Sequence, residues 1–171
     1  MTGAPPSPEP AMLARRVVGA KVNVTPSEAQ ALTHAIAVWV EGRADLKSLG
    51  LAGSWARSSA RANSDLDLLI LADNPEPYRS TQDWLLHILL PEPFRIASHR
   101  GATYGVVWSC HVALEPAAEL ELSFGSLDWA STNPVDAGTR RIISEGLRVI
   151  VDKDGRLQRI VEAVSRSRRR P

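Results

Sequence analysis

The sequence has a single cysteine, Cys110, among its 171 residues. One cysteine excludes an internal disulfide framework and suits a reducing compartment. Neither sign of charge is in excess, because 20 lysines and arginines are balanced by 19 aspartates and glutamates. A net charge of +1 creates no general basic field, so nucleic acid is not the expected partner.

Long hydrophobic runs and targeting signals are also missing. The longest apolar run lies around residues 66–72, well short of a membrane span. Residues 1–10 contain four prolines but neither the basic nor the apolar region of a signal peptide, and we expect a disordered tail there. These absences predict a cytoplasmic protein that does not contact a membrane.

Recognisable cofactor patterns are absent as well. The sequence contains no zinc, haem, Walker or Rossmann pattern, and its four histidines lack the spacing of metal ligands. We interpret His87 and His111 as packing or surface residues. Any metal site must therefore be built from carboxylates.

The length suits one domain, which we place at residues 11–165, followed by a basic C-terminal tail at 166–171. Thr25, Pro26 and Glu28 form a helix-start pattern, so a helix should run to about Glu41. Further helices are expected near 80–90, 137–145 and 157–164, and strands near 47–52, 65–71, 94–97, 104–114, 120–124 and 148–151. This order predicts an α+β fold, a mixed β-sheet with helices packed mainly on one face.

The most informative stretch is residues 49–71. An apolar strand ends at Gly53 and Ser54, a pair suited to a tight turn. Ten residues later a second strand begins with Asp65 and Asp67, which alternate and therefore share one face. Their Cα atoms should lie about 6.5–7 Å apart, so both carboxylates can reach one hard cation. Carboxylates beside a phosphate-holding turn predict a metal-nucleotide site.

The residues of this stretch resemble the nucleotidyltransferase superfamily that includes DNA polymerase β. The similarity is greatest to small bacterial "minimal" nucleotidyltransferases, whose motif reads Gly-Ser-x-Ala-Arg-Gly before Ser-Asp-x-Asp. The matching residues are Gly53, Ser54, Ala56, Arg57, Ser64, Asp65 and Asp67. Ser58 stands where the family usually has Gly, a residue that allows a positive φ. Looser similarity through Glu121 and residues 134–155 extends over most of the chain, which implies a nucleotidyltransferase domain.

The resemblance implies a reaction and its metal ligands. An acceptor hydroxyl attacks the α-phosphorus of a nucleoside triphosphate and expels pyrophosphate, with two Mg²⁺ ions about 3.5–4 Å apart as the usual catalyst. Asp65 and Asp67 would hold those ions. The alternative is that both are surface aspartates on an exposed strand edge.

The resemblance also assigns Gly53, Ser54, Arg57 and Ser64 to binding the triphosphate. Glycine permits close approach, and the following helical turn favours an anion. A plain turn and solvated arginines are the alternatives, and Arg61 is a weaker candidate than Arg57.

The resemblance also implies a third carboxylate on a neighbouring strand, which would hold the catalytic metal or take the proton from the attacking hydroxyl. Glu119 and Glu121 are the candidates, because alternation places them on one face. We select Glu121, which lies deeper in the strand and matches the family position before Phe-Gly. A solvent-facing sheet residue is the alternative.

The leading hypothesis is a Mg²⁺-dependent nucleotidyltransferase that moves AMP from ATP to a hydroxyl of a small molecule or a protein. The choice of ATP follows the habit of the family. The acceptor site must be small, shared across a homodimer, or supplied by a partner protein. The competing hypothesis is a catalytically degenerate, antitoxin-like module that binds nucleotide or a partner.

Overall fold

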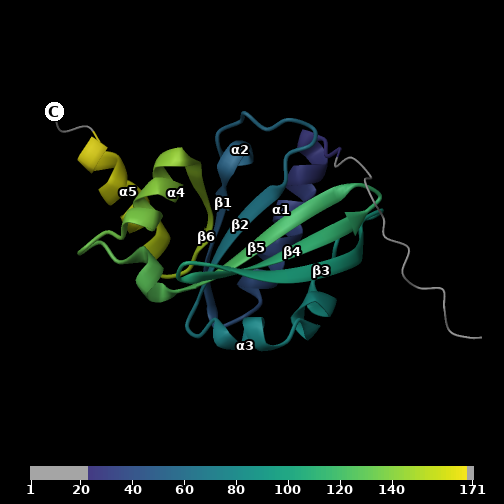
Figure 1. Cartoon of the computed structure of the whole chain (residues 1–171), viewed down its shortest axis with the longest axis horizontal. Coiled ribbons are helices and arrows are strands. Elements are labelled where there is room, and N and C mark those ends of the chain that lie inside the picture. Colours follow the sequence, from purple (N-terminus) through teal and green to yellow (C-terminus); the bar gives the residue numbers. More distant parts are fainter. Residues whose placement is uncertain (1–22, 169–171) are drawn as a thin grey trace, which may run out of the picture.

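The computed structural model describes residues 23–168 (Figure 1). The proline-rich tail predicted at 1–10 and the last three residues of the basic tail lie outside the described residues. The helices and strands, in chain order, are α1 (Pro26–Glu41), β1 (Leu46–Ala52), α2 (Gly53–Ala56), β2 (Leu66–Ala72), α3 (Glu76–Ser80), the 3₁₀ turn η1 (Asp83–His87), β3 (Arg95–Tyr104), β4 (Val107–Glu115), β5 (Ala118–Ser126), the 3₁₀ turn η2 (Leu127–Ala130), α4 (Ala137–Gly146), β6 (Leu147–Asp152) and α5 (Arg156–Arg168).

The six strands form one mixed sheet in the order β3-β4-β5-β2-β1-β6. β2 and β5 run parallel, whereas the other neighbouring pairs are antiparallel. The predicted α+β class and mixed sheet are therefore confirmed. The parallel contact between β2 and β5 brings together two segments that lie about fifty residues apart in the sequence.

The first helix begins where the sequence predicts. The Thr25 hydroxyl accepts a hydrogen bond from the Glu28 backbone N–H at 3.2 Å, and the Glu28 carboxylate accepts one from the Thr25 N–H at 2.8 Å. This reciprocal capping box satisfies two N–H groups that a helix start leaves free. The buried face of α1 carries Leu32, Ile36 and Val40, each fully inaccessible to solvent.

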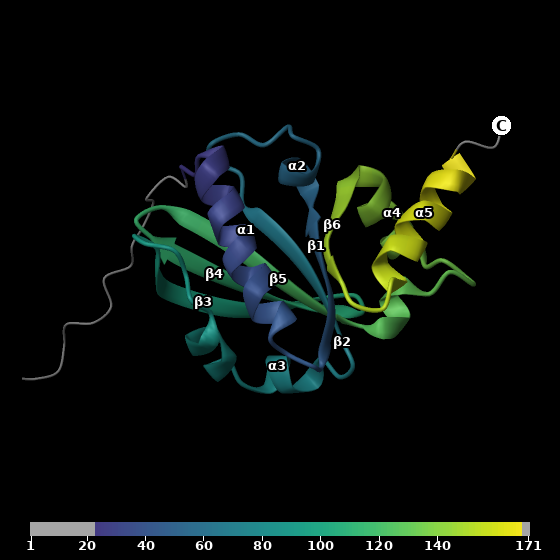
Figure 2. The same cartoon turned by 180° about the vertical axis from the view of Figure 1, so that it is seen from behind.

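The sheet is covered on both faces (Figures 1 and 2). On one face, α1, α3 and η1 enclose the larger core, which includes an aromatic cluster where Tyr78 stacks on Phe124 at 4.7 Å between ring centroids. On the other face, α4, α5 and η2 pack against Leu69 and Leu71 of β2. The prediction placed helices mainly on one face, whereas the structure has a second core on the other face. On this second face the helices leave the β2–β5–β4 part of the sheet uncovered.

The helix predicted near 80–90 is wrong. The chain forms the short helix α3 and then η1, separated by Thr81 in an extended conformation with φ −138° and ψ 156°. The start of α3 is stabilised because the Asn74 side chain accepts a hydrogen bond from the Glu76 N–H at 3.0 Å. Trp84 and Leu85 are buried, but Leu89, which a helix would place on the same face, is 85% exposed, so the segment does not present the apolar stripe of a helix.

The long strand predicted at 104–114 is also divided. Gly105 adopts a positive φ of +60°, which ends β3 at Tyr104 and starts β4 at Val107. A glycine in the first position of a two-residue turn is typical of a tight β-hairpin. β3 runs from Arg95 to Tyr104, so it continues seven residues past the end of the strand predicted at 94–97.

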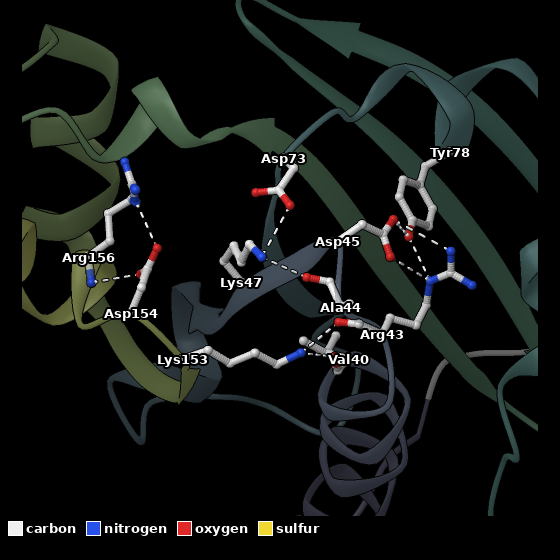
Figure 3. A network of polar contacts seen from close by, with 10 residues as sticks. All are labelled: Val40, Arg43, Ala44, Asp45, Lys47, Asp73, Tyr78, Lys153, Asp154 and Arg156. Carbon is white, nitrogen blue, oxygen red and sulfur yellow. Dashed lines mark hydrogen bonds and ion pairs between the residues drawn. The ribbon is translucent and has the colours of Figure 1, made fainter.

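A network of polar contacts holds the end of α1 against the sheet (Figure 3). The Lys153 ammonium donates to the carbonyls of Val40 at 2.8 Å and Arg43 at 2.7 Å. α1 has no basic residue in its last turn, so Lys153 supplies the positive charge that a helix C-terminus favours. Lys47 pairs with Asp73 at 3.1 Å nearby. These contacts fix the start of β1 and the end of β2. Gly53 and Asp67 lie at the other end of this strand pair.

Candidate active site

The candidate site lies where β1 ends and β2 begins. The antiparallel register pairs Leu51 with Leu68, which brings Gly53 beside Asp67. Gly53 has a φ of +69°, and a Cβ at this position would lie only 2.5 Å from the Asp67 Oδ2. Glycine is therefore required here both by the backbone conformation and by the close approach of the carboxylate.

Asp67, Glu121 and His111 form one row across three strands. The parallel register of β2 and β5 pairs Asp67 with Glu121, and the antiparallel register of β4 and β5 pairs Glu121 with His111. Gly53, Asp67 and Glu121 line a cavity of about 790 Å³, which is walled on other sides by the β3–β4 turn and by α4. The register of the sheet, and not sequence proximity, assembles this row.

A second cavity, of about 650 Å³, lies on the opposite side of the sheet between α1, β1 and β6. Its lining includes two titratable side chains, His34 and Arg148, and no carboxylate. It therefore lacks the oxygen ligands that hard metal ions require. We therefore place the candidate site in the 790 Å³ cavity, because Asp67 and Glu121 line it.

Mutual repulsion among carboxylates shapes the site. Burial, together with the negative charges of Glu121, Asp65 and Glu119, raises the pKa of Asp67 to about 6. Burial and the charge of Glu121 also raise the pKa of Asp65, while His111 partly opposes this shift. A bound cation would relieve this repulsion, so the cluster has the electrostatics of a cation site.

The two candidates for the third carboxylate are placed differently. Glu121 faces Asp67 and lines the cavity, whereas Glu119 lies two residues earlier on β5 and is not part of the cavity wall. The Glu121 side chain is 26% exposed and the Glu119 side chain 32% exposed. This placement favours Glu121, as selected from the sequence. Asp65 lies just before β2 and is exposed, outside the cavity wall but within electrostatic reach of Glu121.

The connector between α2 and β2 adopts the conformation that the resemblance implies. Ser58 has a φ of +57°, the only positive φ of a non-glycine residue among residues 23–168. This is the left-handed conformation that glycine adopts most easily, at the position where the related motif has Gly. The Ser59 N–H donates to the Ser54 carbonyl at 2.9 Å and closes the turn.

Ser64 and Arg57 make structural contacts within this region. The Ser64 hydroxyl accepts a hydrogen bond from the Arg61 N–H at 2.9 Å, which folds the end of the connector. Arg57 donates from Nη1 to the Glu145 carbonyl at the end of α4. Its Cγ lies against Gly146, where a Cβ would approach to 2.6 Å. Binding of phosphate by Ser54, Ser64 and Arg57 stays a prediction.

Arg141 of α4 is a cationic side chain that the sequence analysis did not select. It lines the same cavity as Asp67 and lies 3.9 Å from the Glu145 carboxylate. No motif identifies it, because only the packing of α4 beside β1 brings it to the site. It offers a positive charge on the wall that faces the carboxylate row.

His111 and Tyr104 were also missed as neighbours of the site. His111 is only 9% exposed, and its Nε2 lies 3.1 Å from the Tyr104 hydroxyl. Its Nδ1 lies 3.8 Å from Glu119 Oε1 and 3.9 Å from Glu121 Oε2. The predicted hairpin turn at 115–118 was the nearest available signal, but counting back from it places residue 111 opposite 122, whereas the structure pairs Leu114 with Ala118 and His111 with Glu121.

The donor set fits Mg²⁺ bound together with a nucleotide. Within residues 23–168, no three His, Cys, Asp or Glu side chains converge into a ready-made metal cage. Mg²⁺ is usually bound by one or two carboxylates, with substrate phosphates and waters completing its six ligands. Asp67 and Glu121, beside the close approach at Gly53, meet that requirement without a protein cage.

Comparison with known proteins bears directly on this arrangement. Residues 40–156 match the family model described as "Nucleotidyltransferase domain". The chain belongs to this family. The matched segment contains Gly53, Asp67, Glu121 and His111, so the complete row lies inside it. The search of curated proteins returned no match.

Similar solved structures are more distant. A cytoplasmic RNA terminal U-transferase shares 15% identity at a TM-score of 0.44, over 72% of this chain and 41% of its own. A nucleotidyltransferase-like protein from Exiguobacterium sibiricum 255-15 shares 12% identity at a TM-score of 0.41, over 80% of this chain and 38% of its own. This chain thus spans about two fifths of the length of these two proteins. In the described range, no helix combines the length and apolar character needed to cross a membrane.

Proposed function

We propose that the chain is a Mg²⁺-dependent enzyme that transfers a nucleoside monophosphate, AMP from ATP, to a hydroxyl group and releases pyrophosphate. The observation that carries this proposal is the packing of Gly53 against Asp67 directly opposite Glu121, inside a segment that matches the nucleotidyltransferase domain. Asp65 extends the carboxylate cluster at its exposed end.

Each residue has a defined part in the proposed reaction. Bound Mg²⁺ would neutralise the charge that develops on the phosphates. Asp67 and Glu121 would hold the ion from adjacent strands, with Asp65 as a further ligand. Because Gly53 has no Cβ, the Asp67 carboxylate can lie directly against its backbone, and a phosphate chain bound at this turn would lie beside the metal ligands. A Glu121 oxygen would also accept the proton of the attacking hydroxyl.

The size and lining of the cavity favour a small-molecule acceptor. Its volume of about 790 Å³ falls in the range of small-molecule sites. Beyond the carboxylates, its wall includes Tyr104 and Trp129, while Arg141 and Asp136 lie on the side formed by α4. An acceptor in this part of the cavity would lie beside Glu121. The alternatives are a hydroxyl of a partner protein and a homodimer whose second copy completes the pocket.

Thermal unfolding with Mg²⁺ and each nucleoside triphosphate in turn tests the proposal. A ligand at a hundred times its dissociation constant should stabilise the protein by about 2.7 kcal/mol. We expect the largest shift with ATP, a requirement for Mg²⁺, and no shift in Asp67→Asn. Asp73→Asn is the matched control, because Asp73 follows the opposite end of β2 and pairs with Lys47.

Transfer is then followed with α-labelled nucleotide and candidate acceptors. Label in an acceptor, lost in Asp67→Asn and kept in Asp73→Asn, supports the proposal. A nucleotide-dependent shift without transfer to any acceptor supports the degenerate binding module instead. Absence of a shift with every triphosphate overturns the metal-nucleotide site.

A further inference from the structure

His111, the third residue of the row, makes polar contacts that the proposed reaction does not use. The Tyr104 hydroxyl contacts His111 Nε2 at 3.1 Å, and His111 Nδ1 faces two carboxylates, Glu119 at 3.8 Å and Glu121 at 3.9 Å. We propose that His111 is a positioning residue, which holds the Glu121 carboxylate toward Asp67, and that Tyr104 fixes the orientation of the His111 ring. This inference rests on the proposed function of Asp67 and Glu121.

The hydrogen-bonding capacity of the partners sets the orientation of the ring. Ionised carboxylates only accept hydrogen bonds, so the nitrogen that faces Glu119 and Glu121 is the one that carries a proton. In the neutral ring the other nitrogen, Nε2, is then an acceptor, and the Tyr104 hydroxyl donates to it. The Tyr104 contact therefore selects the form of His111 that presents a donor to the carboxylates.

The surroundings of His111 are those of a site residue. It is one of the buried polar residues, only 9% exposed, and it lies on the same face of the sheet as Asp67 and Glu121. The cross-strand register places it beside Glu121 on β5 and beside Arg100 on β3. Its strand neighbours on the same face, Ser109 and Ala113, are small and leave the ring room to reach the carboxylates.

Glu121 needs such a contact because its neighbours repel it. The charge of Glu121 acts on both Asp65 and Asp67, and Glu119 adds a further negative charge to Asp67. The Ser123 hydroxyl donates to Glu121 Oε1 at 3.5 Å, and His111 supplies a second donor on the side of Oε2. Partners that orient metal ligands in this way are usually worth a factor of 10–100 in metal affinity.

Calorimetric titration with the preformed complex of Mn²⁺ and inorganic tripolyphosphate tests this role without relying on activity. We expect His111→Ala to weaken binding about 10–100-fold. His111→Asn keeps a donor near the position of Nδ1 and should bind within about threefold of wild type, whereas His111→Gln places its amide near Nε2 and should bind like His111→Ala. Tyr104→Phe should weaken binding less than His111→Ala, since it removes only the contact that orients the ring.

His99→Ala is the matched control, because His99 is an exposed histidine on the adjacent strand β3 and pairs with Val112. A double variant shows whether His111 acts through Glu121: His111→Ala should cause no further loss when added to Glu121→Gln. A merely structural role would make the two losses additive.

The outcomes separate the inference from the proposed function. If His111→Ala binds the complex as tightly as wild type, the inference is overturned and the proposed function stays in place. Equal binding by the Asn and Gln variants also overturns it. If wild type itself does not bind the complex, the proposed function fails and the inference fails with it. Should His111→Ala not fold, the comparison of Asn with Gln decides the question.

Discussion

Replacement of Asp67 by Asn should make the metal-free protein more stable at neutral pH. Asp67 has a pKa of about 6 in the folded protein against 3.8 for the ordinary group, chiefly because it is buried among other carboxylates. Between these pH values the folded protein binds more protons than the unfolded chain. The free energy of unfolding therefore falls as pH rises through this window, and the loss persists above it.

The size of this effect follows from the shift. About two pKa units correspond to about 3 kcal/mol at most, and partial exposure of Asp67 to solvent reduces this to about 1–2 kcal/mol. Asn has nearly the same shape and no charge, so Asp67→Asn should recover that amount at pH 7.5. The melting temperature should rise by about 3–6 °C in a protein of this size.

The assay is thermal unfolding in a chelating buffer at pH 7.5 and at pH 4. The gain should be present at pH 7.5 and largely absent at pH 4, where wild-type Asp67 holds its proton. The Asp73→Asn control loses the ion pair with Lys47 and should show no comparable gain. An Asp67→Asn protein that is no more stable than wild type at pH 7.5, or equally stabilised at both pH values, refutes the argument.

Two glycine-related substitutions test the geometry around the site by chemical denaturation. Gly53→Ala should destabilise the protein by about 1–3 kcal/mol, because the added Cβ meets the Asp67 carboxylate at 2.5 Å and the φ of +69° suits glycine; a neutral result would contradict the close approach. Ser58→Gly should be neutral or stabilise the protein by up to about 1 kcal/mol, since it relieves a left-handed φ of +57°; a clear loss of stability would show that the serine side chain is needed there.

Local sequence signals predicted local structure well. The Thr25–Glu28 capping box located the start of α1, and alternation located β2 and β5 within about one or two residues. These elements are specified by residues within one turn or one strand. The helix predicted near 80–90 failed because the buried positions Trp84 and Leu85 are satisfied by a single 3₁₀ turn, while the helical start lies earlier, at Glu76.

The site could be predicted only in part, for a reason of topology. Asp65 and Asp67 share a face by alternation, but the partnership of Asp67 with Glu121 depends on the parallel pairing of β2 with β5. That pairing joins segments far apart in the sequence, and neither strand carries a sequence pattern that identifies the other as its partner. Arg141 reaches the cavity only through the packing of α4. His111 was missed because the turn predicted at 115–118 is one residue longer than the loop in the structure, and a shift of one residue pairs His111 with residue 122 instead of Glu121.

The central claim is that Asp67 and Glu121 together hold a metal ion that carries a nucleoside triphosphate. The most direct measurement is anomalous diffraction from crystals grown with Mn²⁺ and a non-hydrolysable ATP analogue. The account predicts a Mn²⁺ peak in contact with carboxylate oxygens of both residues, with the phosphate chain beside Gly53. An ordered analogue whose Mn²⁺ contacts neither carboxylate, or which lies in the cavity between α1 and β6, would contradict it.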